Sequence, residues 1–156
     1  MDLQKLNFPA YNFPIRLREG KSYIFDRIRR KYVRLTPEEW VRQHVVSYLI
    51  EACHFPVGLI AVERGVALLG KQFRYDAMVC NRAMQPVLLV ECKAPDVSLS
   101  QDVMNQVARY NLMHHVRFLF ISNGLAHYCC EMDFATGTWC FLPQIPRFDE
   151  LTAPSM

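Results

Sequence analysis

The feature that most constrains this fold is a nearly continuous apolar run at residues 87–93. A strand that is apolar along its whole length must be covered on both faces, as in the centre of a sheet. Ala94-Pro95-Asp96 ends the run. The sequence therefore predicts a central strand with other elements packed above and below it.

Two segments have the pattern of helices that could supply this cover. Thr36-Pro37-Glu38-Glu39 combines an N-cap residue, a proline suited to the first helical position and a capping-box acid. Apolar residues then recur at helical spacing until the helix ends near Cys53. Ser98 or Ser100 is expected to cap a second helix that includes Tyr110. The expected fold class is α/β, a mixed central β-sheet flanked by helices.

The remaining strands are expected around these helices. Alternation around Arg16-Leu17-Arg18 and Tyr23-Ile24-Phe25 predicts one or two short strands with a turn between them. Asn123-Gly124 predicts a tight turn in a hairpin. The other strands are predicted over residues 57–63, 66–69, 73–80, 116–122, 125–131 and 138–142. We expect one domain over residues 1–156, divided into a basic, aromatic N-terminal extension (1–35), a core (36–143) and a tail (144–156).

Composition excludes several classes of protein. With 156 residues, 51% of them hydrophobic, the chain can bury the core of one ordinary domain. Its apolar runs are too short to cross a bilayer, and its first residues do not resemble a signal peptide, so we expect a cytoplasmic location and no membrane partner. The net charge of +3 permits nucleic-acid binding without requiring it.

The basic residues are concentrated near the N-terminus. A solvated basic face and a phosphate-contacting surface explain this cluster equally well. The cluster comprises Arg16, Arg18, Lys21, Arg27, Arg29, Arg30, Lys31 and Arg34. As nucleic-acid-binding candidates we take Arg27, Arg29, Arg30 and Lys31 from it, together with Arg74.

Two other patterns carry less weight. The six cysteines have no C-x-x-C spacing and are expected to be reduced structural thiols. A metal site at His127, Cys129 and Cys140 is a rival interpretation, because residues two apart on a strand share a face.

Residues 65–71 spell G-x-x-x-x-G-K, but Gln72 follows and the surroundings are strand-like, so we expect a hairpin and no nucleotide site.

Three ionisable residues interrupt two otherwise apolar strands. Glu91 and Lys93 are two positions apart, so they share one face of a strand, about 7 Å apart. The short connection before this strand would bring Asp76 alongside. Two carboxylates and an ammonium form a site for Mg²⁺ or Mn²⁺, in which the lysine can hold or deprotonate a water molecule. The alternative is a buried ion pair of Lys93 with Glu91 or Asp76 and no metal.

These residues occur in an order that resembles a known family. Asp76 followed by Glu91-Cys92-Lys93 resembles the signature of the PD-(D/E)xK nuclease superfamily. Gln106-Val-Ala-Arg-Tyr110 resembles the Q-x-x-x-Y motif of its RecB-like branch, whose members commonly share the Tyr75-Asp76 pair. The wider pattern is similar to the N-terminal domain of type I restriction enzyme R subunits in a short stand-alone form. Further matching segments are residues 6–9, 24–26, 35–40 and 122–124.

The resemblance implies a restriction-endonuclease-like core that hydrolyses nucleic-acid phosphodiester bonds with Mg²⁺ or Mn²⁺. DNA is the substrate this resemblance favours, and the implied enzyme is an (endo)deoxyribonuclease. It implies that Asp76, Glu91 and the Cys92 backbone carbonyl bind metal, and that Lys93 orients or activates the attacking water. Gln106 and Tyr110 would steady the substrate phosphate or the catalytic residues.

The resemblance also gives Glu39 a role as a metal ligand acting through water. The capping box explains the same residue equally well. R subunits carry a helicase motor, which these 156 residues are too few to contain, so we expect no DNA translocation. A protein partner or a homodimer is left open.

Two other functions compete with the nuclease. One is a catalytically silent module that binds nucleic acid or docks a partner with the same fold. The other is a structural domain with buried ion pairs, which explains the charged residues but not their order. Divalent-metal binding distinguishes the nuclease from both, and salt-dependent DNA binding distinguishes the silent module from the structural domain.

Overall fold

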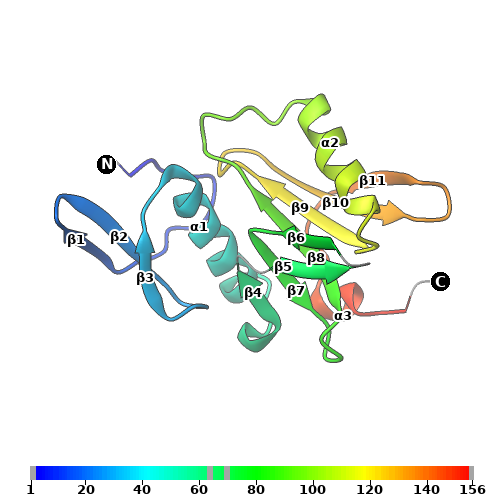
Figure 1. The fold of residues 1–156 in the computed structure, drawn as a ribbon, viewed down its shortest axis with the longest axis horizontal. Helices are drawn as coiled ribbons and strands as arrows, with labels where there is room; N and C mark the ends of the chain where they lie inside the picture. The colour runs from blue at the N-terminus through cyan, green and yellow to red at the C-terminus, as the bar shows by residue number, and fades with distance from the viewer. Residues whose placement is uncertain (1–2, 63–64, 69–70, 155–156) are drawn as a thin grey trace.

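The computed structural model describes residues 3–62, 65–68 and 71–154. Its strands form a six-stranded sheet, a three-stranded sheet and a two-stranded hairpin, with helices beside them (Figure 1). The predicted fold class is confirmed: a mixed central sheet is flanked by helices, consistent with a restriction-endonuclease-like core. Within the described part of the chain, no helix is long and apolar enough to cross a bilayer.

The six-stranded sheet has the order β11-β10-β9-β8-β7-β4. Strand β8 pairs antiparallel with β7 and parallel with β9, which makes the sheet mixed. The side-chain oxygen of Asn123 accepts hydrogen bonds from the Leu125 and Ala126 amides in the predicted turn between β9 and β10. The strands are β4 (Ile60–Val62), β7 (Ala77–Cys80), β8 (Pro86–Cys92), β9 (Phe118–Ser122), β10 (His127–Asp133) and β11 (Thr138–Leu142).

Strand β8 is covered on both faces, as its apolar sequence predicts. Leu88 and Val90 belong to a buried cluster with apolar residues of α1 (Pro37–Glu51). Leu89 belongs to a second cluster, which includes Met104 of α2 (Gln101–Leu112). Because successive strand residues point to opposite faces, α1 and α2 cover opposite sides of the sheet.

Both helices begin where the sequence predicts. The Thr36 hydroxyl accepts a hydrogen bond from the Glu39 amide at 3.0 Å, and Pro37 occupies the first turn of α1. Ser100 rather than Ser98 caps α2, since its hydroxyl accepts from the Val103 amide at 3.3 Å. These bonds satisfy amide donors that have no partner inside the helix.

The three-stranded antiparallel sheet lies on the far side of α1 from the six-stranded sheet (Figure 1). It consists of β1 (Ile15–Arg18), β2 (Lys21–Asp26) and β3 (Lys31–Arg34). The sequence predicts the first two strands and their turn. It does not predict β3, a four-residue strand with a cation at each end.

Two strand predictions are wrong in detail. Residues 73–80 do not form one strand, because β6 (Lys71–Arg74) ends before Tyr75 and β7 begins after Asp76. The Asp76 carboxylate turns back to accept the Cys92 amide, which interrupts the ladder. In place of a strand from 57 to 63, a 3₁₀ turn (Val57–Leu59) precedes β4.

The G-x-x-x-x-G-K segment forms a hairpin, as predicted. Strand β5 (Gly65–Leu68) pairs antiparallel with β6. The tip of the hairpin at residues 69–70, and residue 63 at the end of one predicted strand, lie outside the described residues.

The cysteines and the C-terminal segment complete the fold. The structure describes all six cysteines, and none of them forms a disulfide. The segment at residues 144–156, expected as a tail, contains the short helix α3 (Phe148–Leu151), whose Leu151 is buried.

Candidate active site

The candidate site lies where β7 begins and β8 ends. Ala77 pairs with Val90 in the antiparallel register, so Asp76, one residue earlier, comes beside Glu91. The Cys92 amide donates a hydrogen bond to Asp76 Oδ2 at 2.7 Å. The short connection between these strands therefore brings Asp76 to the Glu91-Cys92-Lys93 segment, as predicted.

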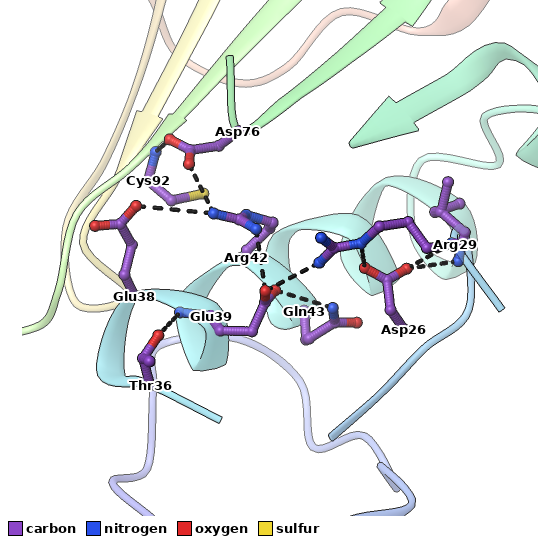
Figure 2. Close-up of polar contacts among 10 residues, drawn as sticks. Asp26, Arg29, Thr36, Glu38, Glu39, Arg42, Gln43, Asp76 and Cys92 are labelled. Atoms are coloured by element: carbon purple, nitrogen blue, oxygen red, sulfur yellow. Dashed lines mark hydrogen bonds and ion pairs between the residues drawn. The ribbon is translucent and has the colours of Figure 1, made fainter. Parts of the chain in front are cut away.

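Arg42 of α1 fixes the position of the Asp76 carboxylate. Its Nη2 donates to Asp76 Oδ1 at 2.9 Å, and its Nη1 donates to Glu39 Oε1 at 3.0 Å (Figure 2). Arg42 is 5% exposed, so both bonds lie in a largely water-free environment. The sequence interpretation missed this residue, although a cation between apolar positions of a helix was a usable signal.

Glu38 is the helical acid that faces this site. Its Oε1 lies 3.8 Å from Arg42 Nη2, on the Asp76 side of the guanidinium (Figure 2). Burial and the charge of Asp76 raise the pKa of Glu38, against the opposing charges of Arg42 and Lys93. Glu38 is therefore electrostatically coupled to Asp76 and Lys93.

Glu39 instead belongs to a buried ion-pair network. Its carboxylate accepts hydrogen bonds from Arg29 and Arg42, each at 3.0 Å, and from Gln43 at 3.1 Å. The capping box is consequently half formed: the Glu39 amide bonds to Thr36, but its carboxylate points toward Arg29 (Figure 2). The structure places Glu38, and not Glu39, on the Asp76 side of Arg42.

Glu91 has the most perturbed carboxyl group of the site. Burial and the nearby charge of Asp76 raise its pKa to about 8, with a further contribution from Glu38. The positive charges of Lys93 and Arg42 act in the opposite direction. At neutral pH this carboxyl group therefore holds a proton unless another cation approaches it.

Lys93 follows directly after β8 and is held by its backbone, whose amide donates to the Ser122 carbonyl at 2.8 Å. Its positive charge lowers the pKa of both Glu91 and Glu38, so the ammonium lies within electrostatic reach of both carboxyl groups. The three predicted residues Asp76, Glu91 and Lys93 thus share one site.

The two candidates on α2 differ in their surroundings. Tyr110 is 41% exposed, and partial burial and the charge of Glu91 raise its pKa, so its hydroxyl faces the site. Gln106, one turn earlier on α2, is exposed. Because α2 covers the face of the sheet opposite α1, Tyr110 and Arg42 approach the site from opposite sides.

A buried pair beneath Tyr110 was missed from the sequence. The Tyr75 hydroxyl is hydrogen-bonded to Nδ1 of His114, and both residues are buried. Burial and the negative charges near it raise the pKa of Tyr75, while burial lowers the pKa of His114. The sequence placed His114 only at the end of α2, because the strand break that turns Tyr75 toward it carries no local signal.

The rival cysteine site is not assembled. Across residues 3–62, 65–68 and 71–154, no group of three or more His, Cys, Asp or Glu side chains is arranged to hold a metal ion. Cys140 lies opposite Glu131 on exposed β11, and Cys129 lies opposite Leu142. Hydrogen bonds to Ser122 Oγ and the Asn7 carbonyl occupy both ring nitrogens of His127.

One pocket is lined by three of the candidate nucleic-acid-binding residues, Arg27, Arg29 and Arg30. Arg27 pairs with Glu51 at 2.9 Å, and Arg29 pairs with Asp26 and Glu39. Arg30 and Lys31 are exposed at the β2–β3 turn. Arg74 is exposed at the end of β6.

The fold and site define an α/β domain with coupled acidic and basic groups at the edge of two central strands. The family model described as "Type I restriction enzyme R protein N terminus (HSDR_N)" matches residues 37–146. The chain belongs to this family.

A solved fragment of a putative HsdR subunit of a type I restriction enzyme from Vibrio vulnificus YJ016 is similar at 27% identity. The match covers 59% of this chain and 19% of that one, with a TM-score of 0.40. This chain therefore spans about a fifth of that solved chain. No curated protein matches the sequence.

Proposed function

We propose that this protein is a metal-dependent nuclease that hydrolyses phosphodiester bonds of nucleic acid, with DNA as the substrate. The observation that carries the proposal is Glu91, a half-buried carboxyl group that lies beside Asp76 in the strand register and whose pKa is raised to about 8 by desolvation and by the charge of Asp76. Perturbed carboxyl groups of this kind concentrate at functional sites. Membership of a family named after a restriction enzyme subunit supports a nucleic-acid substrate.

The residues present fit a Mg²⁺ or Mn²⁺ ion. Asp76, Glu91 and the Cys92 carbonyl would supply the hard oxygen ligands that these ions prefer, and Glu38 would contribute through water. Arg42 and the Cys92 amide each bond one oxygen of Asp76, but a carboxylate oxygen has a second lone pair free to accept another partner. When bound, the metal would supply positive charge for the developing oxyanion and for the attacking water.

The chain's own residues would complete the reaction. Lys93 would hold and orient the attacking water through its ammonium, which lies near Glu91 and Glu38. Tyr110, partly exposed on the opposite side, would donate a hydrogen bond to a phosphate oxygen. Gln106, one turn away on exposed α2, would position the neighbouring phosphate.

A second candidate function is a catalytically silent module that binds nucleic acid or docks a partner. One observation favours it: Arg42 forms an ion pair with Asp76 at 2.9 Å and so compensates its charge. In such a protein, the acidic cluster would be a structural ion-pair network that never exchanges Arg42 for metal.

A cleavage assay distinguishes these two functions. We would incubate the protein with supercoiled plasmid, linear duplex and single-stranded DNA in Mg²⁺, Mn²⁺ or EDTA. We expect cleavage with metal and none in EDTA, and a loss of at least about a hundredfold in Asp76→Asn, Glu91→Gln and Lys93→Met.

The control is Glu131→Gln. Glu131 lies on the distant strand β10 and forms a partly exposed ion pair with Arg117, which this substitution breaks. It should cleave as the wild type does. Cleavage that persists in EDTA, or that all variants share, would contradict the proposal. If the wild type cleaves none of the substrates, the silent module is the better account.

A further inference from the structure

The N-terminal three-stranded sheet has one face on which cations and aromatic rings alternate. The antiparallel register places Arg16 opposite Tyr23, and Tyr23 opposite Arg34, in one row across all three strands. Neighbouring rows pair Arg18 with Lys21 and Phe25 with Tyr32. Because paired residues and residues two apart point the same way, one face carries all seven side chains. We call it the basic aromatic face: Arg16, Arg18, Lys21, Tyr23, Phe25, Tyr32 and Arg34.

This face carries positive charge with no compensating acid among its seven residues. Asp26, the acid within these strands, points to the opposite face, where it is buried with Ile24 and hydrogen-bonded to Arg29. Glu19 lies in the β1–β2 turn rather than on a strand. The four cations of the face are exposed and the three rings are half-buried. The opposite face thus buries Ile24 and Asp26 while its Ile15 and Leu17 are exposed, and the cations of the basic aromatic face point to solvent.

The cations lie over the rings. The Arg16 guanidinium carbon is 4.2 Å from the Tyr32 ring centre, and the Arg34 guanidinium carbon is 6.0 Å from the Tyr23 ring centre. The Phe25 and Tyr32 rings lie 5.3 Å apart. A guanidinium stacked on a ring keeps its outer plane and its N–H donors available, so the face offers flat surfaces and phosphate donors in alternation.

We propose that the basic aromatic face binds single-stranded nucleic acid. A single strand repeats a flat base and an anionic phosphate, which matches rings and guanidinium planes interleaved with cations. In a duplex the bases are stacked inside, so the rings would have no partner. An acidic peptide or an anionic membrane would use the charges but not the planar groups.

This surface is separate from the candidate active site. The match to the family model begins at residue 37, after the three strands, and α1 lies between their sheet and the six-stranded sheet (Figure 1). The inference rests on the proposed function only in treating the bound strand as a substrate. Binding itself needs no metal and no intact carboxylates, so each proposal can fail without the other.

The test is fluorescence anisotropy with a labelled oligothymidine of about 20 nucleotides, longer than typical single-strand footprints. EDTA prevents cleavage. We expect Tyr32→Leu to weaken binding roughly five- to a hundredfold, and Tyr32→Phe to bind as the wild type does, since phenylalanine keeps the ring. Arg16→Gln with Arg34→Gln should lower the slope of log affinity against log salt by about 1.4, the value for two lost phosphate contacts.

A matched control removes two arginines elsewhere. Arg82 lies in the β7–β8 connection and Arg147 precedes α3, and both are exposed. Arg82→Gln with Arg147→Gln should leave the affinity and the salt slope unchanged. Circular dichroism of each variant establishes that it is folded.

Three outcomes would overturn the inference. Equal affinity in the wild type and the Arg16–Arg34 variant would mean that the face does not bind the strand. Tighter binding of a matched duplex, unaffected by Tyr32→Leu, would mean phosphate contact without stacking. The protein could also bind phosphatidylserine vesicles more tightly than the oligonucleotide and lose this binding in the Tyr32→Leu and Arg16–Arg34 variants. That result would mean that the basic aromatic face binds a membrane surface.

Discussion

Arg42 Nη2 donates a hydrogen bond to Asp76 Oδ1 at 2.9 Å and thereby ties α1 to the start of β7. The guanidinium has a second partner in Glu39 and lies 3.8 Å from Glu38. It therefore holds the helix against the candidate site and separates the two acids of the first helical turn into different environments.

Replacing Arg42 should destabilise the protein strongly. Arg42→Met removes the ion-pair partner that bonds Asp76 Oδ1 and one of the two arginine partners of Glu39, and the loss of one partner from a buried ion pair costs about 3–5 kcal/mol. Urea denaturation measures the change. The control is Arg27→Met, whose pair with Glu51 is 40% and 54% exposed and should contribute at most about 1 kcal/mol. Equal losses in the two variants would contradict the assigned role of Arg42.

Replacing Glu38 and replacing Glu39 should have different effects on stability and on Mn²⁺ binding. Glu39→Gln weakens a carboxylate that accepts from Arg29, Arg42 and Gln43, so we expect a loss of about 1–3 kcal/mol in stability. Glu38→Gln should alter stability by less than about 0.5 kcal/mol, as expected at an exposed position, and should weaken Mn²⁺ binding. Urea denaturation and Mn²⁺ titration of both variants test this, and the reverse pattern would restore Glu39 as the metal-associated acid.

Glu91 should make stability depend on pH. Its pKa rises from 4.5 to about 8 on folding, so the folded state holds a proton that the unfolded state loses. Stability therefore falls as pH rises from about 4.5 to about 8, by at most about 1.4 kcal/mol per pH unit. In EDTA, Glu91→Gln should raise the free energy of unfolding relative to wild type at pH 8.5 more than at pH 5. Equal effects at both pH values would mean that Glu91 is not buried in this way.

Gly124 should resist substitution. Its φ is +87°, and an added Cβ would lie 2.8 Å from Leu6 Cδ2 and 3.2 Å from Val41 Cγ2. We expect Gly124→Ala to cost about 1–3 kcal/mol more than Gly137→Ala, whose φ is +68° but whose surroundings are open. Thermal denaturation compares the two. Similar losses would mean that Leu6 moves aside without cost.

The sequence predicts the elements whose signals are local. The apolar run became β8 within one residue at each end, and Thr36 caps α1 as its hydroxyl and the following proline suggest. Asn123-Gly124 forms the predicted turn between β9 and β10. These features depend on residues adjacent in the chain, so they are visible without a structure.

What the sequence does not predict depends on tertiary packing. Glu38 and Glu39 are adjacent, and only the rotation of α1 against the sheet decides which of them faces Asp76. At the break between β6 and β7, the Cys92 amide donates a hydrogen bond to Asp76, sixteen residues away in the chain. Tyr75, at the same break, is hydrogen-bonded to His114, and neither contact between distant residues has a local sequence signal.

The most direct test of the central claim is a calorimetric Mn²⁺ titration of the wild type, Asp76→Ala, Glu91→Ala and the control Glu131→Ala. We predict that the wild type and the control bind Mn²⁺ and that the two site variants do not. Binding should also tighten between pH 6 and 8, because Glu91 must lose its proton. No binding by the wild type at millimolar Mn²⁺ with DNA present, or equal binding by all four proteins, would contradict the account.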